Sequence, residues 1–445
     1  MTLSVLDAAR ESAHQPALVL DNQVVTYGEL ATLVRRRVPE LLIDDRQTPL
    51  PLVCEPALPT LVTLFACFEA RRPVALLHPR WPAAQRERIA ESCARFRLSH
   101  AADDEAALVV AFTSGSTGEP KGVELSRRAI LASAAASADR LGWRPDDRWL
   151  LALSFAHVGG LSVLTRCLLA RRPVVLGGGA RFSAAAVARL MANDRVTLAS
   201  LVPTQLAQLL ADSTLARPPA SLRALLLGGA AASRHLLERA GDLGWPVLTT
   251  YGLTEACSQV ATERPGLAHR RAQRGADPLA GVEVRCRAGR IEVRSPVLFT
   301  AYHTSNGAHP ALDPDGWFQT QDLGRIDGAG RLHVFGRADD LITTGGEKVA
   351  PVEVEQEIEG CVGVREACVF GVADPIWGQR LAAALTVAPD FRLEVLVSWI
   401  RDRLAPFQRP RLVALLEALP VTEGGKLDRR AVAALSEPLL HPLPG

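Results

Sequence analysis

Hydrophobic positions in the middle of the chain gather in short apolar runs, and the stretches between these runs have helical spacing. Short apolar runs bounded by polar residues predict buried strands, here at 107–112, 150–153, 174–176, 197–201, 222–227 and 247–250. The intervening stretches predict helices at 161–170, 183–191, 204–210 and 233–240, and a further helix starts at Ser126. Ser126, Ser183 and Ser233 stand where N-caps are expected. This alternation predicts a parallel sheet with helices on its faces.

The first 106 residues have a simpler pattern. A short strand runs into a helix over 24–38, a buried helix is predicted at 61–70, and a buried strand follows at 73–77. No grouping of polar residues there suggests chemistry. We therefore expect this part of the chain to be a scaffold.

The pattern changes after residue 280 to short strands of alternating polarity at 282–285, 290–294 and 331–335. These predict a small antiparallel or β-barrel-like subdomain. The glycine-rich, charged stretch 336–348 is typical of a boundary, so residues 1–336 and 337–445 are expected to form separate domains. Beyond it we expect a helix at 352–359 opened by Pro351, strands at 367–372 and 381–387, a helix at 393–404, and a last helix capped by Asp428. The predicted fold class is α/β with a small α+β C-terminal domain.

Composition narrows the class of protein. A chain of 445 residues predicts more than one domain, and its near-neutral formal charge of +2 without a long basic run argues against nucleic-acid binding. The eight cysteines form no CxxC pair, which argues against zinc and favours a reducing compartment. Neither a signal peptide nor a long apolar span is found, which predicts a cytoplasmic protein without a stable membrane anchor. The partners expected are small molecules, and a homo-oligomer is left open.

One loop combines backbone freedom with hydroxyl groups and a cation. It contains Thr113, Ser114, Gly115, Ser116, Thr117, Gly118 and Lys121. Glycines let backbone N–H groups approach an anion, and hydroxyls and lysine bind phosphate oxygens. The lysine spacing differs from that of the common P-loop. A flexible Gly/Ser loop is the alternative, but only three of the 50 basic residues are lysines, at 121, 348 and 426, so each stands out.

Further motifs follow predicted strands, where parallel sheets bind their ligands. His157 precedes a glycine pair, Gly228-Gly229-Ala230 follows a strand, and Tyr251-Gly252-Leu253-Thr254-Glu255 offers an aromatic ring, a hydroxyl and a carboxylate. Asp322 ends the stretch 316–322. Each has an ordinary alternative: a backbone-bonded histidine, a tight turn, a turn aspartate.

Taken together and in this order, these motifs resemble those of the adenylate-forming superfamily of acyl-CoA ligases, adenylation domains and luciferases, over nearly the whole chain. The stretches 199–206, 225–231 and 406–410 are similar to those of 2-succinylbenzoate–CoA ligases of menaquinone synthesis. The resemblance implies a large domain hinged to a small one, and two reactions. ATP with Mg²⁺ first activates an acid as its acyl-adenylate, and coenzyme A then takes the acyl group.

The resemblance also implies residue roles. Residues 113–121 would wrap the β- and γ-phosphates, and Gly228, Gly229 and Ala230 would form the adenine shelf. Tyr251 would stack on the base, and Gly252 would also bind ATP. Thr254 would contact the α-phosphate, Glu255 would bind magnesium, Asp322 and Arg337 would hold the ribose, Asp339 would be the hinge, and Lys426 would bridge the carboxylate and the α-phosphate. Gly346 and Lys348 would serve coenzyme A. The chain departs from the family pattern at Gln321 and Ser154.

The acid pocket is expected to include His157, Thr204 and Arg166. Arg166 is unusual in an apolar helix, and we interpret it as a partner for a second carboxylate of the acid; an arginine reaching the surface is the alternative. Other functions compatible with these motifs are a ligase for another aryl or fatty acid, a free-standing adenylation enzyme that loads a carrier protein, and an inactive nucleotide-binding regulator. Lys121, Glu255 and Lys426 argue against the last.

Overall fold

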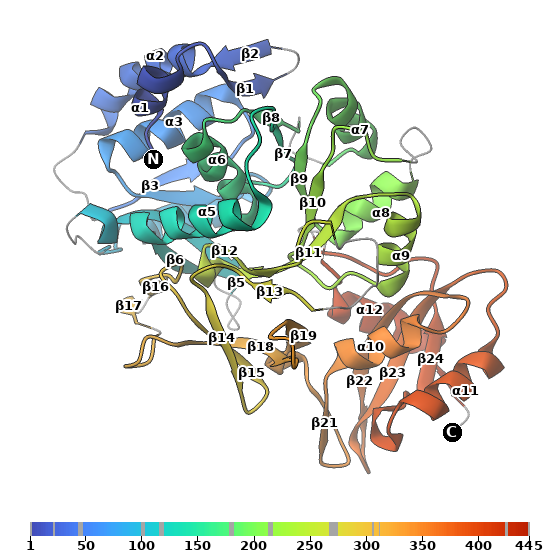
Figure 1. Cartoon of the computed structure of the whole chain (residues 1–445). Helices are drawn as coiled ribbons and strands as arrows, with labels where there is room; N and C mark the ends of the chain where they lie inside the picture. The colour runs from blue at the N-terminus through green and yellow to red at the C-terminus, as the bar shows by residue number, and fades with distance from the viewer. Residues whose placement is uncertain are drawn as a thin grey trace.

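The computed structural model describes residues 2–20, 23–42, 48–98, 103–114, 120–177, 182–211, 217–266, 275–304, 307–310, 312–422 and 426–443. Figure 1 shows two layered sheets with helices, a smaller strand-rich region below them, and a C-terminal region to one side. No helix within the described ranges is long and apolar enough to cross a membrane.

The largest sheet has the strand order β13-β12-β11-β10-β9-β7-β8-β1-β2. The neighbours from β11 through β1 are parallel, as the strand–helix alternation predicts. The strands are β1 (Pro16–Leu20), β2 (Gln23–Thr26), β7 (Trp149–Leu151), β8 (Val174–Leu176), β9 (Leu198–Leu201), β10 (Ala224–Leu227), β11 (Val247–Leu253), β12 (Ser258–Thr262) and β13 (Asp277–Pro278).

Helices cover both faces of this sheet because its strands are apolar on both sides. In β10, Leu225 and Leu227 belong to a core shared with the helices α7 and α8, whereas Ala224 and Leu226 belong to the core shared with α6. The covering helices are α5 (Arg127–Leu141), α6 (Val158–Ala170), α7 (Ala184–Asn193), α8 (Pro203–Ala211) and α9 (Arg234–Asp242). The predicted caps are confirmed, since Ser126, Ser183 and Ser233 each accept a hydrogen bond from a first-turn N–H.

A second sheet, in the order β17-β16-β6-β5-β4-β3, holds the predicted phosphate loop. Its strands are β3 (Leu50–Val53), β4 (Val74–Leu77), β5 (Ala107–Ser114), β6 (Pro120–Ser126), β16 (Ala301–Thr304) and β17 (Gly307–His309). The sequence predicted that the loop passes from a strand into a helix, and this is wrong. The chain first returns as β6, antiparallel to β5, and α5 begins only after it. The N-terminal helices are α1 (Val5–Ser12), α2 (Tyr27–Arg37), α3 (Leu58–Ala70) and α4 (Ala83–Cys93), of which α3 and α4 contact β3 or β4 of this sheet and α2 contacts β1 and β2.

The predicted antiparallel region is a four-stranded sheet in the order β14-β15-β18-β19. Its strands are β14 (Glu283–Arg287), β15 (Arg290–Arg294), β18 (Phe318–Ile326) and β19 (Leu332–Arg337). Asp322 on β18 lies opposite Arg337 on β19. This register brings two predicted ribose contacts together.

The C-terminal region has its own sheet and core. Strands β21-β20-β23-β24-β25 lie in this order and β22 pairs with β23; two of its apolar cores contain only residues from 342 onward. The strands are β20 (Ile342–Thr344), β21 (Glu347–Val349), β22 (Val364–Asp374), β23 (Gly378–Val387), β24 (Leu412–Leu415) and β25 (His441–Pro442), and the helices are α10 (Pro351–Glu359), α11 (Leu393–Arg403) and α12 (Arg429–Ser436). Asp428 caps α12 as predicted. This region packs against α9 (Figure 1).

Candidate active site

A single cleft of about 3250 Å³ gathers most of the predicted site. Residues of all four sheets line it. The predicted residues among its lining are Thr113, Lys121, His157, Arg166, Thr204, Gly228, Gly229, Ala230, Tyr251, Gly252, Thr254, Glu255, Asp322, Arg337, Asp339 and Lys426. Gly115, Ser116, Thr117 and Gly118 lie outside the described residues, and Ser114 is described only as the last residue of β5.

The β5–β6 hairpin positions Lys121 in the cleft wall. Lys121 is paired with Thr113 across the two strands. Its Nζ atom lies 5.8 Å from the centre of the Tyr302 ring on the neighbouring strand β16. A cation over an aromatic face is favourable, so Lys121 is held at this edge of the cleft.

Glu255 lies in a short 3-10 turn (Thr254–Ala256) directly after β11. Its Oε1 atom accepts a hydrogen bond of 2.8 Å from the hydroxyl of Tyr302. The described residues contain no group of three or more His, Cys, Asp or Glu side chains that could hold a metal ion by themselves. A lone carboxylate still fits Mg²⁺, which is commonly bound by one or two carboxylates together with substrate phosphates and water.

The side of the cleft that is predicted to hold the ribose is built from two sheets. The Tyr251 hydroxyl donates a 2.6 Å hydrogen bond to Oδ2 of Asp322. Burial, and then the negative charge of Asp322, raise the pKa of Tyr251 far above its ordinary value. Tyr251 is therefore a permanent donor that links β11 to β18, and Arg337 lies opposite Asp322.

Two of the predicted nucleotide-binding glycines are required by the fold itself. A Cβ atom at Gly228 would lie 2.7 Å from Cγ2 and 2.8 Å from the carbonyl oxygen of Thr250 on the next strand. At Gly252 it would lie 2.0 Å from the carbonyl oxygen of Ser258. Both glycines thus permit close strand packing, and their exposed backbone forms the cleft surface as a consequence.

Two histidine rings meet at the opposite end of the cleft. His157 is the N-cap residue of α6, and its ring centre lies 5.2 Å from that of His78. Burial, followed by the charge of Arg80, lowers the pKa of His78 to about 4. Burial, followed by His78 and then Lys426, lowers the pKa of His157 to about 4. Although His157 is open to the cleft, both rings are neutral at pH 7.

His78 corrects the expectation that the first 106 residues are only a scaffold. It lines the cleft together with Arg80 and Trp81. One sequence signal points to His78: it directly follows the predicted strand 73–77, at the carboxyl end of that strand. Tyr302 was also missed; it stands on β16, a strand that local patterning did not predict.

Arg166 is buried inside α6 rather than directed to the surface. Only 3% of it is exposed, and its Nε and Nη2 atoms have no hydrogen-bond partner among the described residues. Its guanidinium carbon lies 5.6 Å from the centre of a Trp149 ring, and burial lowers its pKa to about 10. A buried, unpaired guanidinium that lines a cleft is unfavourable unless an anion joins it.

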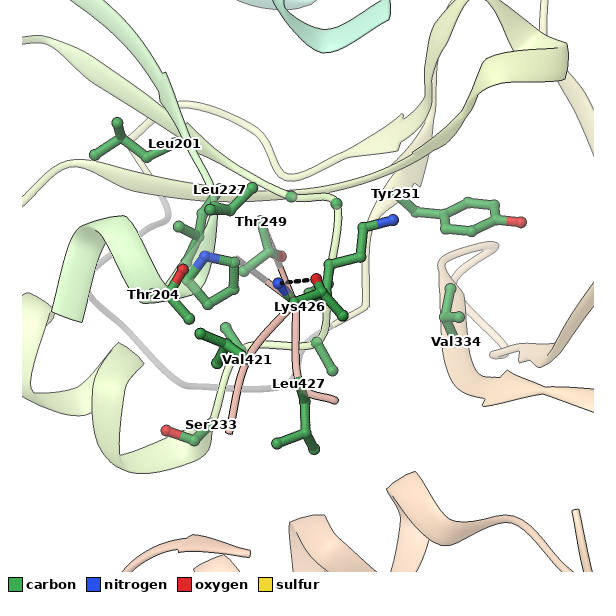
Figure 2. A pocket seen from close by; sticks show the side chains of 18 of the residues that line it. Leu201, Thr204, Leu227, Ser233, Thr249, Tyr251, Val334, Val421, Lys426 and Leu427 are labelled. Carbon is green, nitrogen blue, oxygen red and sulfur yellow. Dashed lines mark hydrogen bonds between the residues drawn. The ribbon is translucent and has the colours of Figure 1, made fainter. Parts of the chain in front are cut away.

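Lys426 enters the same cleft from the C-terminal region. Figure 2 shows it reaching toward Tyr251, with Thr204, Leu227 and Thr249 nearby. Burial and the positive charge of Arg337 lower the pKa of Lys426, whereas Asp322 acts in the opposite direction. The structure therefore brings together residues about three hundred positions apart.

Gly346 and Lys348, the residues predicted for coenzyme A, do not line this cleft. Gly346 lies in the turn between β20 and β21, Lys348 lies in β21, and both residues are exposed. The indole of Trp377 closes over the adjacent Gly345, where an added Cβ atom would lie 2.7 Å from that ring. In this arrangement the C-terminal region presents Lys426 to the cleft and leaves the β20–β21 turn in solvent.

These features define an enzyme that binds a nucleotide in a cleft between a large layered region and a small C-terminal region. The AMP-binding enzyme family model matches residues 95–290, and the model of the AMP-binding enzyme C-terminal domain matches residues 353–426. The chain is 37% identical to the 2-succinylbenzoate–CoA ligase of Bacillus velezensis over 75% of this chain and 69% of the relative. It is 36% identical to that of Bacillus subtilis, over 73% and 68%.

Solved structures of the same class of enzyme are similar to this chain. The Bacillus subtilis o-succinylbenzoate–CoA synthetase in complex with its acyl-adenylate intermediate has a TM-score of 0.80 and 29% identity over 96% of each chain. The same enzyme in complex with ATP and a magnesium ion has a TM-score of 0.80 over 96% of this chain and 98% of that one. This chain belongs to the adenylate-forming family of AMP-binding enzymes, together with the 2-succinylbenzoate–CoA ligases.

Proposed function

We propose that this protein is an ATP-dependent acid–CoA ligase that converts 2-succinylbenzoate into its acyl-adenylate and then into the CoA thioester. The observation that carries the proposal is the position of Lys426, which faces His157, Asp322 and Arg337 across one cleft. The relatives named for the same reaction support the choice of acid. The thioester would then enter menaquinone synthesis, as the family resemblance implies.

The first reaction requires a carboxylate to attack the α-phosphate of ATP. Two anions repel each other, so fixed positive charge must lie where they meet. Lys426 would lie between the two groups, Lys121 would hold the leaving pyrophosphate, and Asp322 with Arg337 would hold the ribose. Mg²⁺, bound through Glu255, would neutralise charge on the phosphates.

Arg166 would select the acid. 2-Succinylbenzoate has a second carboxylate, and the unpaired guanidinium of Arg166 is a matching partner at the cleft wall. The neutral rings of His78 and His157 add no positive charge to that end of the cleft, where Arg80 and Lys426 are the cations that lower the pKa of His157. A monocarboxylate such as benzoate would leave Arg166 unpaired.

The second reaction would use another arrangement of the C-terminal region. Lys348 and Gly346 lie outside the cleft here, so a rotation about Asp339 would be needed to bring them to the acyl-adenylate. We propose that residues 1–336 and 337–445 are the two bodies that move. A cytoplasmic location fits the eight free cysteines, and a homo-oligomer stays a prediction.

Pyrophosphate release with a panel of acids, with and without coenzyme A, tests this function. We expect release with 2-succinylbenzoate well above that with benzoate or a fatty acid, and CoA thioester as the product. Background activity with 2-succinylbenzoate but activity with another acid would replace the substrate. Adenylate formation that ignores coenzyme A and transfers to a carrier protein would replace the reaction.

A further inference from the structure

The chain contains only three tyrosines, and the hydroxyl of each has a defined acceptor. That of Tyr27 is buried and donates to the carbonyl oxygens of Cys167 and Arg172 at 3.3 Å. Those of Tyr251 and Tyr302 donate instead to carboxylates of the cleft, at Asp322 and Glu255. In a chain with so few tyrosines, two serve side chains that are proposed to hold the nucleotide and its metal.

The position of Tyr302 is set by the strand that carries it. On β16, Tyr302 is paired with Val123, and the next residue, His303, is paired with Gly122 on β6. Successive side chains of a strand point to opposite faces. Tyr302 therefore faces the cleft, whereas His303 points inward.

The inward side of β16 is firmly anchored. Nε2 of His303 lies 2.6 Å from Oε2 of Glu124, and these side chains are 2% and 1% exposed. The Phe96 ring stacks against His303 with centres 4.9 Å apart. This buried pair holds β16 in register with β6. It therefore helps to keep Tyr302 beside the 3-10 turn that contains Glu255.

Glu255 is held by Tyr302 and by Phe299, three residues before Tyr302. The Phe299 N–H donates to the carbonyl oxygen of Glu255 at 2.8 Å, and the Phe299 ring packs against that of Tyr302 with centres 4.6 Å apart. The Tyr302 hydroxyl occupies Oε1 of the carboxylate. Such a bond restricts rotation of the carboxylate and leaves its other oxygen for a ligand.

We propose that Tyr302 is a positioning residue whose hydroxyl orients Glu255 toward the Mg²⁺ that accompanies ATP. This inference rests on the proposed function, because it assumes a metal–nucleotide complex at Glu255. The hydroxyl of Tyr302 acts through Glu255 and contributes a preset carboxylate orientation to metal binding. Lys121, which is proposed to bind phosphate, lies over the ring of the same tyrosine. Tyr302 therefore contacts both Lys121 and the proposed metal ligand Glu255.

The test is Mn²⁺ binding, followed by electron paramagnetic resonance with a non-hydrolysable ATP analogue and no acid, so that no turnover occurs. Tyr302→Phe keeps the ring and removes only the hydroxyl. We expect Mn²⁺ affinity to fall about 10- to 100-fold, the range found for the loss of hydrogen bonds to metal ligands. In assays, the KM for Mg²⁺ should rise while kcat at saturating Mg²⁺ changes little.

Tyr27→Phe is the matched control, because it removes a tyrosine hydroxyl away from the cleft and should leave Mn²⁺ affinity unchanged. Unchanged Mn²⁺ affinity in Tyr302→Phe would overturn the inference. So would an equal loss of affinity for the metal-free nucleotide analogue, since that result indicates general damage to the cleft. Glu255→Gln tests the proposed metal ligand separately from the positioning role of Tyr302. If this variant retains full metal affinity, Glu255 is not the metal ligand, whatever the result for Tyr302→Phe.

Discussion

The two cleft lysines come from regions that hold them in different ways. Lys121 stands on β6, which is hydrogen-bonded to β5 on one side and β16 on the other. Lys426 stands in a turn, described at residues 421–422 and 426–427, that contains the Val421–Leu427 bridge. There the Thr422 N–H donates to the Lys426 carbonyl oxygen at 2.7 Å, and the Lys426 N–H donates to the Thr422 hydroxyl at 3.2 Å. Under the proposed function, the first lysine would belong to a fixed wall, and the second would leave the cleft with the C-terminal region.

This difference indicates how one cleft could serve two reactions. If the C-terminal region moves as proposed, Lys121 in the middle of a sheet would stay with the phosphates in every arrangement. Lys426 would act only while its region is docked. The turn must nevertheless be rigid within its own region, or the docked lysine would not lie at a defined place.

The anchor for the Lys426 turn is Arg429, three residues further on. Its guanidinium forms an ion pair with Glu355 of α10 and donates to the carbonyl oxygen of Val369 at 2.5 Å. Glu355 is 6% exposed and also accepts the Val369 N–H at 2.7 Å. This buried network joins α10, β22 and the start of α12.

Among these substitutions, replacing Lys426 should have the largest effect on activity. We expect Lys426→Ala to slow adenylate formation by on the order of 10²–10³-fold, as for other losses of charge stabilisation in a transition state. Thioester formation from supplied acyl-adenylate should stay within a few fold, because Lys426 is then not needed. Pyrophosphate release and thioester assays measure the two steps. Lys121→Ala is the counterpart and should mainly raise the KM for ATP. Equal losses in both steps for Lys426→Ala would contradict the division between the lysines.

Arg429→Ala should have the next largest effect. Leaving Glu355 buried without its partner costs on the order of 3 kcal/mol of unfolding free energy, and adenylate formation should fall more than thioester formation, since only the first step uses the Lys426 turn. Denaturant unfolding and the two step assays measure these effects. Arg430→Ala, at the exposed neighbouring position, is the control. A stability loss with no difference between the steps would mean that Arg429 does not position Lys426.

Arg166 tests the fixed wall of the cleft. Arg166→Ala should raise the KM for 2-succinylbenzoate about 10- to 150-fold, the effect of losing one hydrogen bond to a charged group, and should change the KM for benzoate little. Steady-state kinetics with both acids measure the difference. An equal, small change for both acids would contradict a role for Arg166 in selecting the acid.

The smallest effect concerns the contact between the two regions. Glu359 of α10 accepts hydrogen bonds of 3.2 Å from the backbone N–H groups of Arg234, at the start of α9, and Ala367. Burial raises the pKa of Glu359 to about 8. The raised pKa means that the neutral acid is favoured in the folded protein. The stability due to this group is therefore fully present below about pH 4.5 and is lost as the pH rises through about 8.

Glu359→Gln keeps a neutral side chain at every pH. Its unfolding free energy relative to the wild type should rise by at least about 1 kcal/mol between pH 5 and pH 9. Denaturant unfolding at both pH values measures this. A difference that is constant with pH would show that Glu359 does not titrate in this contact.

Local rules predicted the elements that need no distant partner. The caps at Ser183, Ser233 and Asp428 were correct because a hydroxyl or carboxylate at a helix start bonds N–H groups only a few residues away. The strand β6 was missed because its hairpin and its pairing with β16 are contacts with other parts of the chain. His78 was missed because its partner, His157, lies far along the chain at the start of α6.

The sequence by itself determined the alternating strands and helices of the largest sheet, the motifs that identify an adenylate-forming enzyme, and the three lysines that an arginine-rich chain retains. These are properties of composition and short spacing. Only the tertiary structure decided that the Nε and Nη2 atoms of Arg166 are buried with no hydrogen-bond partner among the described residues, that Tyr302 bonds Glu255, and that Lys426 faces the cleft whereas Lys348 does not. Each depends on strand register and on the docking of two regions, which no short stretch of sequence encodes.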